Sequence, residues 1–259
     1  MFLALDRKTQ HLIDLLIEFT KKEIKLRYKR TYLGFFWSLL HPLVYALVYF
    51  FAFKIVMRIS IQNYAIFLLC GLFPWQFLVN GAMGSVNVFI HNGTLIRKTA
   101  FPKELLALSV ALNQLVHFLL AIPVLVLLLA LYRIGPTWDW VYGLPLLIGF
   151  QFLMVAGICM ICSVINLFFR DLERIVALGF HVLFFLTPIV YHADAIPPSL
   201  RQFIFLQPFA PTIVTYQQLF LEGHFSWFYF NWMCVYSSII FCMGLWVFQR
   251  FRWRLAEAI

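Results

Sequence analysis

The sequence predicts an all-α integral membrane protein with six transmembrane helices, and three observations support this prediction. Of the 259 residues, 63% are hydrophobic and only 12% are charged, whereas a soluble domain has about 25% charged residues. Six long runs carry no formal charge, and about 20 apolar residues are enough to cross a bilayer. The cations are gathered in short stretches between these runs. The bilayer is therefore the expected solvent of most of this chain.

The first expected element is an amphipathic helix on the cytoplasmic membrane surface, and we assign residues 1–32 to it as an interface helix. Residues 9–30 contain no Gly and no Pro. Apolar side chains recur there at helical spacing: Leu12, Leu15, Leu16 and Phe19. The end of this stretch carries four cations: Lys25, Arg27, Lys29 and Arg30. We expect Gly34 to mark the bend into the membrane.

A transmembrane domain of six spans is expected at residues 33–249, followed by a cytoplasmic tail at residues 250–259. The uncharged runs that predict the spans are residues 31–53, 59–96, 105–132, 140–169, 175–193 and 223–249. The second run is too long for one straight span. We expect it to bend or end at one of four residues: Gly71, Pro74, Gly81 or Gly84.

The apolar stretch at residues 195–223 does not have the pattern of a simple span. It contains four prolines: Pro197, Pro198, Pro208 and Pro211. A proline inside a helix costs about 3 kcal/mol, so we expect two short helical pieces joined at residues 207–211. Broken apolar pieces enter a membrane only where protein covers them or where they line a cavity. We therefore predict re-entrant gate helices here, with an ordinary surface loop as the alternative.

The Lys and Arg residues predict the orientation of the spans. If the N-terminus is inside, sixteen of the twenty fall in the cytoplasmic segments 1–32, 92–104, 168–174 and 249–259. The other four fall at outer ends and loops: Lys54, Arg58, Arg133 and Arg201. Because cytoplasmic loops carry the excess of cations, we expect both termini in the cytoplasm and residues 195–223 on the outer side.

Several classes of function are disfavoured by what the sequence lacks. All eleven acidic residues lie at or outside the expected span ends, whereas ion-driven pumps use carboxylates within the membrane. No glycine precedes a lysine, so the G-x-x-x-x-G-K-[ST] phosphate-binding loop is absent. Uphill transport would therefore need energy from another subunit. No separate basic domain is present to grip nucleic acid.

Enzymatic and metal-binding roles have weak support. Cys159 and Cys162 form a C-x-x-C pair without further ligands nearby, so we expect all five cysteines to be buried apolar residues. His41 and His117 have no carboxylate or second histidine at i+3 or i+4, and we expect them to make polar contacts between helices. A polytopic membrane enzyme of glycan or lipid transfer remains the alternative class.

The segment KLRYKRTYLGFFWSLLHPL at residues 25–43 resembles the first-span signature of ABC-2 type membrane subunits that export polysaccharides. The matching residues are Arg27, Tyr28, Thr31, Leu33, Gly34, Trp37 and Pro42. Four later segments resemble the family in the same order: GLFPWQF (71–77), NLFFRDLERIV (166–176), FFLTPIVY (184–191) and LQPFAPTIVTYQQLFLEG (206–223). Gln207 stands where the family often has Asn, and Gln218 where it often has Arg.

Within this family the chain is most similar to the membrane subunits of O-antigen lipopolysaccharide exporters, and exporters of capsule, teichoic acid or drugs are the alternatives. The resemblance implies a homodimer of six-span subunits in the bacterial inner membrane, with two ATPase subunits beneath that bind ATP and Mg. It implies an undecaprenyl-diphosphate-linked glycan as the substrate, and no cofactor in this chain itself.

Four groups of residues are the candidate sites. Docking of the ATPase is expected at Glu23, Arg27, Tyr28, Arg97, Lys98 and Glu104. Capture of the lipid diphosphate is expected at Lys25, Arg27, Lys29 and Arg30, since Arg and Lys suit phosphate oxygens. Weak stacking of sugar rings along the glycan path is expected at Trp37, Tyr45, Tyr49 and Tyr191. The outer gate is expected at Phe203, Pro208, Phe209 and Pro211.

Overall fold

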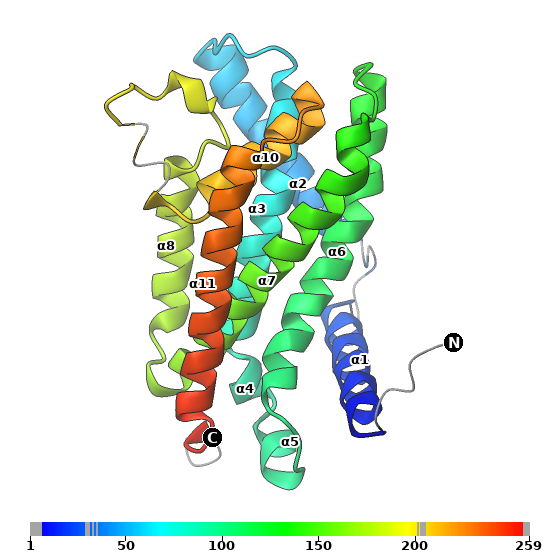
Figure 1. The fold of residues 1–259 in the computed structure, drawn as a ribbon, viewed down its shortest axis with the longest axis vertical. Helices are drawn as coiled ribbons and strands as arrows, with labels where there is room; N and C mark the ends of the chain where they lie inside the picture. Colours follow the sequence, from blue (N-terminus) through cyan, green and yellow to red (C-terminus); the bar gives the residue numbers. More distant parts are fainter. Residues whose placement is uncertain are drawn as a thin grey trace.

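A computed structural model describes residues 7–28, 32, 34, 36–200, 202 and 206–255, with Lys8, Arg27, Tyr28 and Ser38 described by their backbone only. Three predicted site residues, Lys29, Arg30 and Phe203, lie outside the described residues. Within the described part, the chain forms a bundle of helices without β-strands (Figure 1). This confirms the prediction of an all-α protein.

The bundle is built from ten helices of the described residues, two of which continue into π-helical turns. The helices are α1 (Arg7–Tyr28), α2 (Phe36–Tyr49), α3 (Tyr64–Val86), α4 (Val88–His91), α5 (Gly93–Lys98), α6 (Glu104–Leu131), α7 (Trp138–Phe168), α8 (Leu172–Leu186), α10 (Ala210–Gln217) and α11 (Trp227–Phe251). The π-helical continuations are η1 (Phe50–Val56) after α2 and η3 (Gln218–Glu222) after α10. A short 3-10 turn, η2 (Ala193–Ala195), follows α8.

Among the described residues, five helical segments are long and apolar enough to cross a membrane. They are α2 with η1, α3, α6, α7 and α11. The expected fifth span at residues 175–193 corresponds to α8, which has only 15 residues and ends at Leu186. Pro188 explains this end, because a residue before proline is driven out of the helical region. Thr187 is accordingly extended, with φ −87° and ψ 138°.

The expectation that the second run ends at one of the four named residues is wrong. Helix α3 continues through all of them to Val86, and α4 begins at Val88 after Asn87. Two of the glycines allow close packing instead. A side-chain carbon on Gly81 would lie 2.5 Å from Cγ1 of Val155, and one on Gly71 would lie 3.1 Å from Nε2 of Gln217. Small residues let membrane helices approach closely, so Gly71 and Gly81 allow tight packing of α3 against its neighbours.

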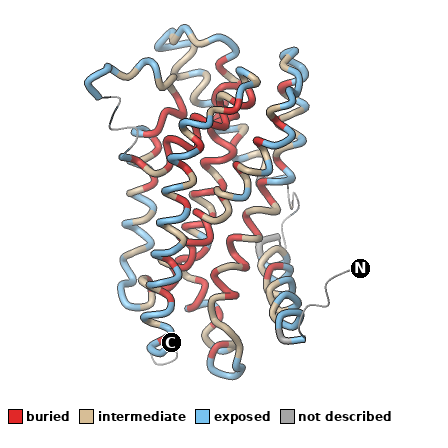
Figure 2. The backbone as a smooth tube through the Cα atoms, viewed as in Figure 1, coloured by how far each residue is buried: buried red, intermediate tan, exposed pale blue. Residues whose placement is uncertain are grey.

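The core of the bundle lies around α3 and α7, where buried residues are concentrated (Figure 2). Helix α7 packs most extensively against α11. At this crossing a side chain on Gly157 would lie 2.6 Å from the carbonyl oxygen of Ile240, and one on Gly244 would lie 2.7 Å from that of Gly157. The two backbones therefore approach as closely as small-residue helix contacts allow.

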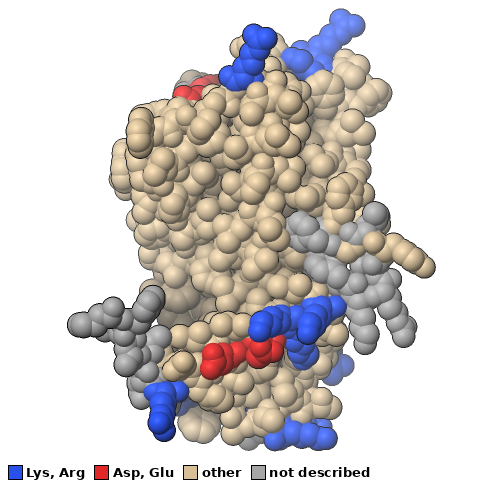
Figure 3. Space-filling view, turned by 90° about the vertical axis from the view of Figure 1, so that its right-hand side faces the viewer, with Lys and Arg blue, Asp and Glu red and all other residues tan. Residues whose placement is uncertain are grey.

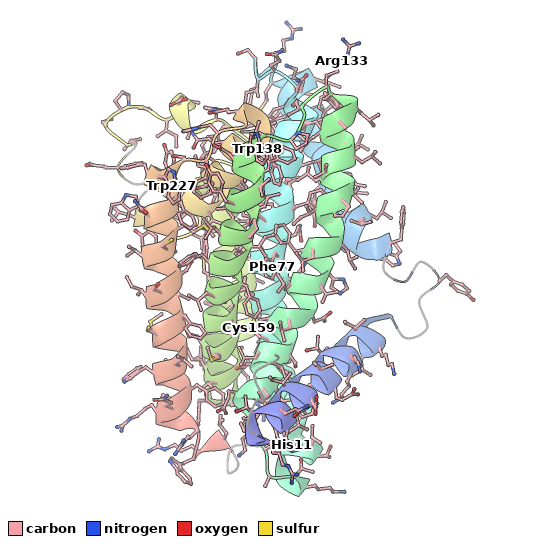
Figure 4. All side chains as sticks on the ribbon, turned by 45° about the vertical axis from the view of Figure 1, so that its right-hand side comes forward. His11, Phe77, Arg133, Trp138, Cys159 and Trp227 are labelled. Atoms are coloured by element: carbon pink, nitrogen blue, oxygen red, sulfur yellow. The ribbon has the colours of Figure 1, made fainter. Side chains whose placement is uncertain are left out.

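On the face of the molecule shown in Figure 3, the charged side chains of the described residues lie toward the two ends, and a zone without charge lies between them. Helices α1 and α5 and the last described residues lie at one end, called here the α5 end (Figure 1). His11 lies at this end, whereas Arg133 and Trp138 lie at the opposite end (Figure 4). This distribution is typical of a multi-pass membrane protein.

The cysteines follow their prediction only in part. Cys70, Cys159 and Cys162 are buried and free, but Cys242 on α11 is exposed. The expectation that all five are buried is therefore wrong for Cys242, and Cys234 is only half-buried. Helix α11 packs against α7 with one side only, so the opposite side of this apolar helix is left uncovered by the chain.

Candidate functional site

A groove with a volume of about 310 Å³ opens between α2, α3 and α8, and we call it the aromatic groove. Its aromatic lining residues are Tyr45, Tyr49, Trp75, Phe180 and Phe184. Tyr49 stacks on Phe184 with ring centroids 5.1 Å apart, and Trp75 meets Phe184 edge-on at 5.9 Å. The rings therefore support one another as a continuous wall, in geometries that aromatic pairs prefer.

Neutral polar side chains line the rest of the aromatic groove. They are His41, Gln76, Asn80 and His181. Binding pockets commonly combine an apolar or aromatic lining with a few hydrogen-bonding groups that orient the ligand. Ring faces beside amides and imidazoles suit a ligand that has both apolar C–H faces and hydroxyl groups.

A second cavity of about 640 Å³ lies toward the α5 end, and we call it the polar pocket. Its polar lining residues are Lys22, Glu23, Asn80, His91, Asn92, Asn113, Gln114 and Glu173. Asn80 and Met83 line both this pocket and the aromatic groove. The two cavities therefore share a wall on α3 and lie next to each other along the bundle.

Helix α1 is fixed against the bundle beside the polar pocket. Nζ of Lys22 donates to Oδ1 of Asn92, whose Nδ2 donates to the carbonyl of Val88 at 2.8 Å. Phe19 and Phe101 pack with ring centroids 5.1 Å apart. These contacts join α1 to α4 and to the segment between α5 and α6. A movement of α1 would therefore change the lining of the polar pocket directly.

Glu23 is half-buried at this junction. Burial raises the pKa of its carboxyl above the ordinary value, because a desolvated carboxylate is disfavoured. The nearby Lys22 and His91 oppose part of this rise in pKa. The Glu23 carboxylate is thus partly withdrawn from water.

A chain of hydrogen bonds joins three helices at the α5 end. Nδ2 of Asn166 on α7 donates to Oδ1 of Asn87 at 3.0 Å. Nδ2 of Asn87 in turn donates to Oε2 of Glu173 at 2.8 Å. Glu173 lines the polar pocket, so the start of α8 is held in register with α3 and α7 at the pocket's edge.

The broken segment is anchored to the end of the aromatic groove that lies away from α5. Nε2 of Gln207 donates to Oγ1 of Thr187, and Nε2 of Gln217 donates to the carbonyl of Pro188 at 3.1 Å. Phe209 stacks on Phe180 at 5.6 Å between ring centroids. The expected second helical piece is present as α10, which begins at Ala210 with a proline in its first turn. The first piece lies largely outside the described residues.

The structure brings two of the predicted path residues together. Tyr45 and Tyr49 line the aromatic groove, with ring centroids 6.1 Å apart. Trp37 is 44% exposed and meets His41 edge-on at 5.9 Å, just beyond the groove. Tyr191 lies away from the groove lining, and its hydroxyl donates to the carbonyl of Leu186 at 3.0 Å.

The other predicted groups lie at the two ends of the bundle. Arg97 and Lys98 are exposed at the end of α5, Glu104 begins α6, and Lys25 is exposed on α1. At the opposite end, Phe209 and Pro211 are buried and Pro208 is half-buried. Phe209 thus packs inside its own subunit rather than projecting from it.

Sequence reasoning missed the neutral polar residues Gln76, Asn80 and Asn113. The sequence does indicate them, because amide side chains are uncommon in long apolar runs. Gln76 and Asn80 are also spaced by one helical turn, so they lie on the same side of a helix. His117 was expected at a helix contact and is indeed buried among α3 and α6 residues. Among the described residues, no cluster of His, Cys, Asp or Glu is arranged to hold a metal ion.

Comparison with known proteins adds an independent finding. The sequence model of the family described as ABC-2 type transporter matches residues 15–221. The chain is 41% identical to an O-antigen export system permease protein RfbA of Klebsiella pneumoniae over 249 residues, which is 96% of each chain. It is 39% identical over 259 residues to a second protein of that name and organism, with both chains fully covered. A Myxococcus xanthus protein of the same name is 32% identical over 210 residues, 80% of each chain.

Proposed function

The chain belongs to the ABC-2 type transporter family, and on this premise we propose that it is the permease subunit of an ATP-driven exporter. The cargo is O-antigen polysaccharide linked to undecaprenyl diphosphate, which it carries across the bacterial inner membrane. The observation that carries the proposal is the near-complete overlap with relatives named as O-antigen export permeases. The chain is thus a transport subunit rather than a catalytic enzyme.

The proposed topology has six spans, with α8 as the fifth. Helix α8 is short, but the residues that follow it, including Val190, are buried. We place them at the outer end of the bundle. The α5 end faces the cytoplasm, since most of the Lys and Arg residues of the sequence lie there. Both termini are then cytoplasmic, and α10 lies on the outer side.

Energy for transport comes from a separate ATPase subunit, which binds ATP and Mg. Its docking surface is formed by α1 and α5, with Glu23, Arg27, Tyr28, Arg97, Lys98 and Glu104 as contact residues. Support for this comes from the position of α5 as the part of the bundle that projects furthest at the α5 end (Figure 1). A second copy of the chain completes the exporter as a homodimer.

The aromatic groove forms one wall of the glycan path, with Tyr45 and Tyr49 on it and Trp37 and Tyr191 near its two ends. A sugar ring stacks its C–H face on an aromatic ring, and each such contact is weak. Repeated weak contacts allow a long polymer to move without being trapped, as conduction through any pore requires. The cations Lys25, Arg27, Lys29 and Arg30 bind the diphosphate of the carrier lipid at the cytoplasmic membrane surface.

Residues 195–223 form the outer gate. Phe209 is packed against Phe180 and Trp75, both of which line the aromatic groove. A sugar that enters this part of the groove would compete with Phe209 for the same ring faces. The gate would therefore open when the glycan displaces the broken segment from the groove wall. Pro208 and Pro211 would confine the change in backbone conformation to the short stretch between these two prolines.

A gene deletion with complementation tests the proposed function. Cells without the chain should accumulate finished, lipid-linked glycan in the cytoplasmic leaflet, and the wild-type chain should restore glycan at the cell surface. The double variant Tyr45→Ala/Tyr49→Ala should restore export only weakly, with a rate roughly five- to a hundredfold lower, since each of the two lost aromatic contacts is worth about 0.5–1.5 kcal/mol.

Leu47→Ala is the matched control, because Leu47 lies on the same helix and is 69% exposed. This variant should export like the wild type. Accumulation of unfinished glycan in the deletion strain would point to an enzyme of glycan transfer instead. Export by the purified chain in vesicles without any ATPase would also contradict the proposal.

A further inference from the structure

We propose that the polar pocket binds uncharged sugar residues, namely those that lie next to the carrier lipid, while the diphosphate stays outside on the cations of α1. This inference rests on the proposed function and assigns a ligand class to a cavity that the path residues do not include. Three observations carry it: the size and position of the pocket, a buried amide oxygen that has no hydrogen-bond partner among the described residues, and the balance of charge among the described lining residues.

The pocket has the size and position of a ligand site. Its volume of about 640 Å³ falls within the range of about 300–1,000 Å³ that is usual for small-molecule sites. It is enclosed by α1 on one side and by α3, α4 and α6 on the other, and it adjoins the aromatic groove through Asn80. A glycan that starts in this pocket would continue directly into the groove.

The amide of Asn113 is the most specific feature of the pocket. Asn113 is only 4% exposed, and its Oδ1 has no hydrogen-bond partner among the described residues. A buried carbonyl oxygen without a donor costs about 1–3 kcal/mol, so the site is more stable when a ligand supplies a donor. A hydroxyl group supplies one, whereas a fully ionised phosphate oxygen only accepts.

The charge of the described lining disfavours the diphosphate. Among the side chains that the structure describes, the pocket has one lysine, Lys22, against two carboxylates, Glu23 and Glu173. A diphosphate placed there would face two like charges, one of them already partly desolvated. Carboxylates and amides are, in contrast, good acceptors for hydroxyl hydrogens.

A neighbouring hollow on α1 has the opposite charge balance. It is lined by Lys21, Lys22 and Lys25 with the single carboxylate of Glu18. Lys22 lines both the hollow and the polar pocket. The structure thus offers a cationic place for the diphosphate and, directly beside it, an uncharged or slightly acidic place for the sugars attached to it.

Photolabelling of the full-length protein in lipid nanodiscs tests this assignment. One probe is a photoreactive alkyl maltoside, which has an uncharged sugar headgroup, and the other is a photoreactive alkyl diphosphate without sugar. The key variant is Asn113→Leu, which removes the amide and keeps a side chain of similar size. Asn80→Leu changes a second side of the pocket. The control is Ser237→Ala, which removes a buried hydroxyl on α11 that has no hydrogen-bond partner among the described residues.

We expect the maltoside to label peptides of α1 and α6 in the wild type and in Ser237→Ala. Labelling should fall about five- to tenfold in Asn113→Leu, as the loss of one buried hydrogen bond predicts, and it should also fall in Asn80→Leu. Labelling by the diphosphate probe should stay unchanged in both variants. Excess phosphatidylglycerol, which has hydroxyls but no sugar ring, should not compete with the maltoside.

Three results would overturn the assignment: unchanged maltoside labelling in both pocket variants, an equal loss of diphosphate labelling, or full competition by phosphatidylglycerol. Complementation separates this failure from failure of the proposed function. If the wild-type chain restores surface glycan but the pocket variants label normally, only the sugar pocket is refuted. If the wild-type chain restores no surface glycan, the exporter function itself fails.

Discussion

At the scale of single residues, amide side chains and aromatic rings line most of the candidate site. Asn80 lines both cavities, and Asn113, whose Oδ1 has no hydrogen-bond partner among the described residues, lines one of them. Among the described lining residues, charged side chains occur in the cavity toward the α5 end, where Lys22, Glu23 and Glu173 line the polar pocket. This arrangement avoids the high cost of a charge at the bilayer centre.

Glu23 gives a prediction on the dependence of stability on pH. Because burial raises the pKa of its carboxyl above 4.5, the folded state binds a proton more tightly than the unfolded state. The stabilising contribution of Glu23 to the free energy of unfolding is therefore fully present below pH 4.5, and it is lost as the pH rises through the raised pKa of the carboxyl. Among the described side chains, the other charged or titratable groups around the carboxyl are Lys22, His91 and Glu173.

Glu23→Gln should consequently raise the melting temperature of the detergent-solubilised protein at pH 7.5. The rise is expected to be small, roughly 1 °C, since water screens the half-exposed carboxylate. The difference from the wild type should shrink as the pH is lowered toward 4.5. A lower melting temperature for the variant at pH 7.5 would show that attraction to Lys22 outweighs desolvation.

At the scale of helices, glycine contacts and prolines decide how the bundle is assembled. Prolines lie inside α2, α3, α6 and α7 without ending them. Membrane helices tolerate such prolines because neighbouring groups satisfy the freed backbone. Pro188 does end α8, and the chain then turns back toward the broken segment.

The crossing of α7 and α11 gives a prediction at this scale. Gly157→Leu should destabilise the protein strongly, because the new side chain would meet the backbone of Ile240, which cannot move aside. Overpacking typically costs about 1–3 kcal/mol, and thermal unfolding followed by size-exclusion chromatography measures it. Gly149→Leu is the control on the same helix, since nothing lies within 4 Å of a side-chain carbon there. Equal stability of the two variants would contradict the observed helix contact.

At the scale of the whole molecule, the separation of charge predicts the orientation in the membrane. In spheroplasts, a membrane-impermeant maleimide should label Gly135→Cys, which lies between α6 and α7 at the end away from α5. Lys98→Cys on α5 should react only after the membrane is permeabilised. The reverse pattern would place α5 outside and would remove the docking surface proposed for the ATPase.

The site as a whole was only partly predictable from the sequence. Tyr45 and Tyr49 were named because they share one side of a single helix, which spacing reveals. The aromatic groove also needs Trp75 and Phe180 from two other helices, and no local pattern connects these segments. The placement of Phe209 inside its own subunit was equally invisible, because it depends on contacts with α3 and α8.

The sequence by itself determined that this is an all-helical membrane protein, that a helix precedes the first span, and which segments carry charge. These properties follow from composition, helical spacing and the cost of charge in lipid, all of which are local. Tertiary structure alone decided which apolar faces meet, and so where the aromatic groove and the polar pocket are. The physical reason is that lipid and protein interiors are both apolar, so hydrophobicity does not distinguish a lipid-facing side from a buried one.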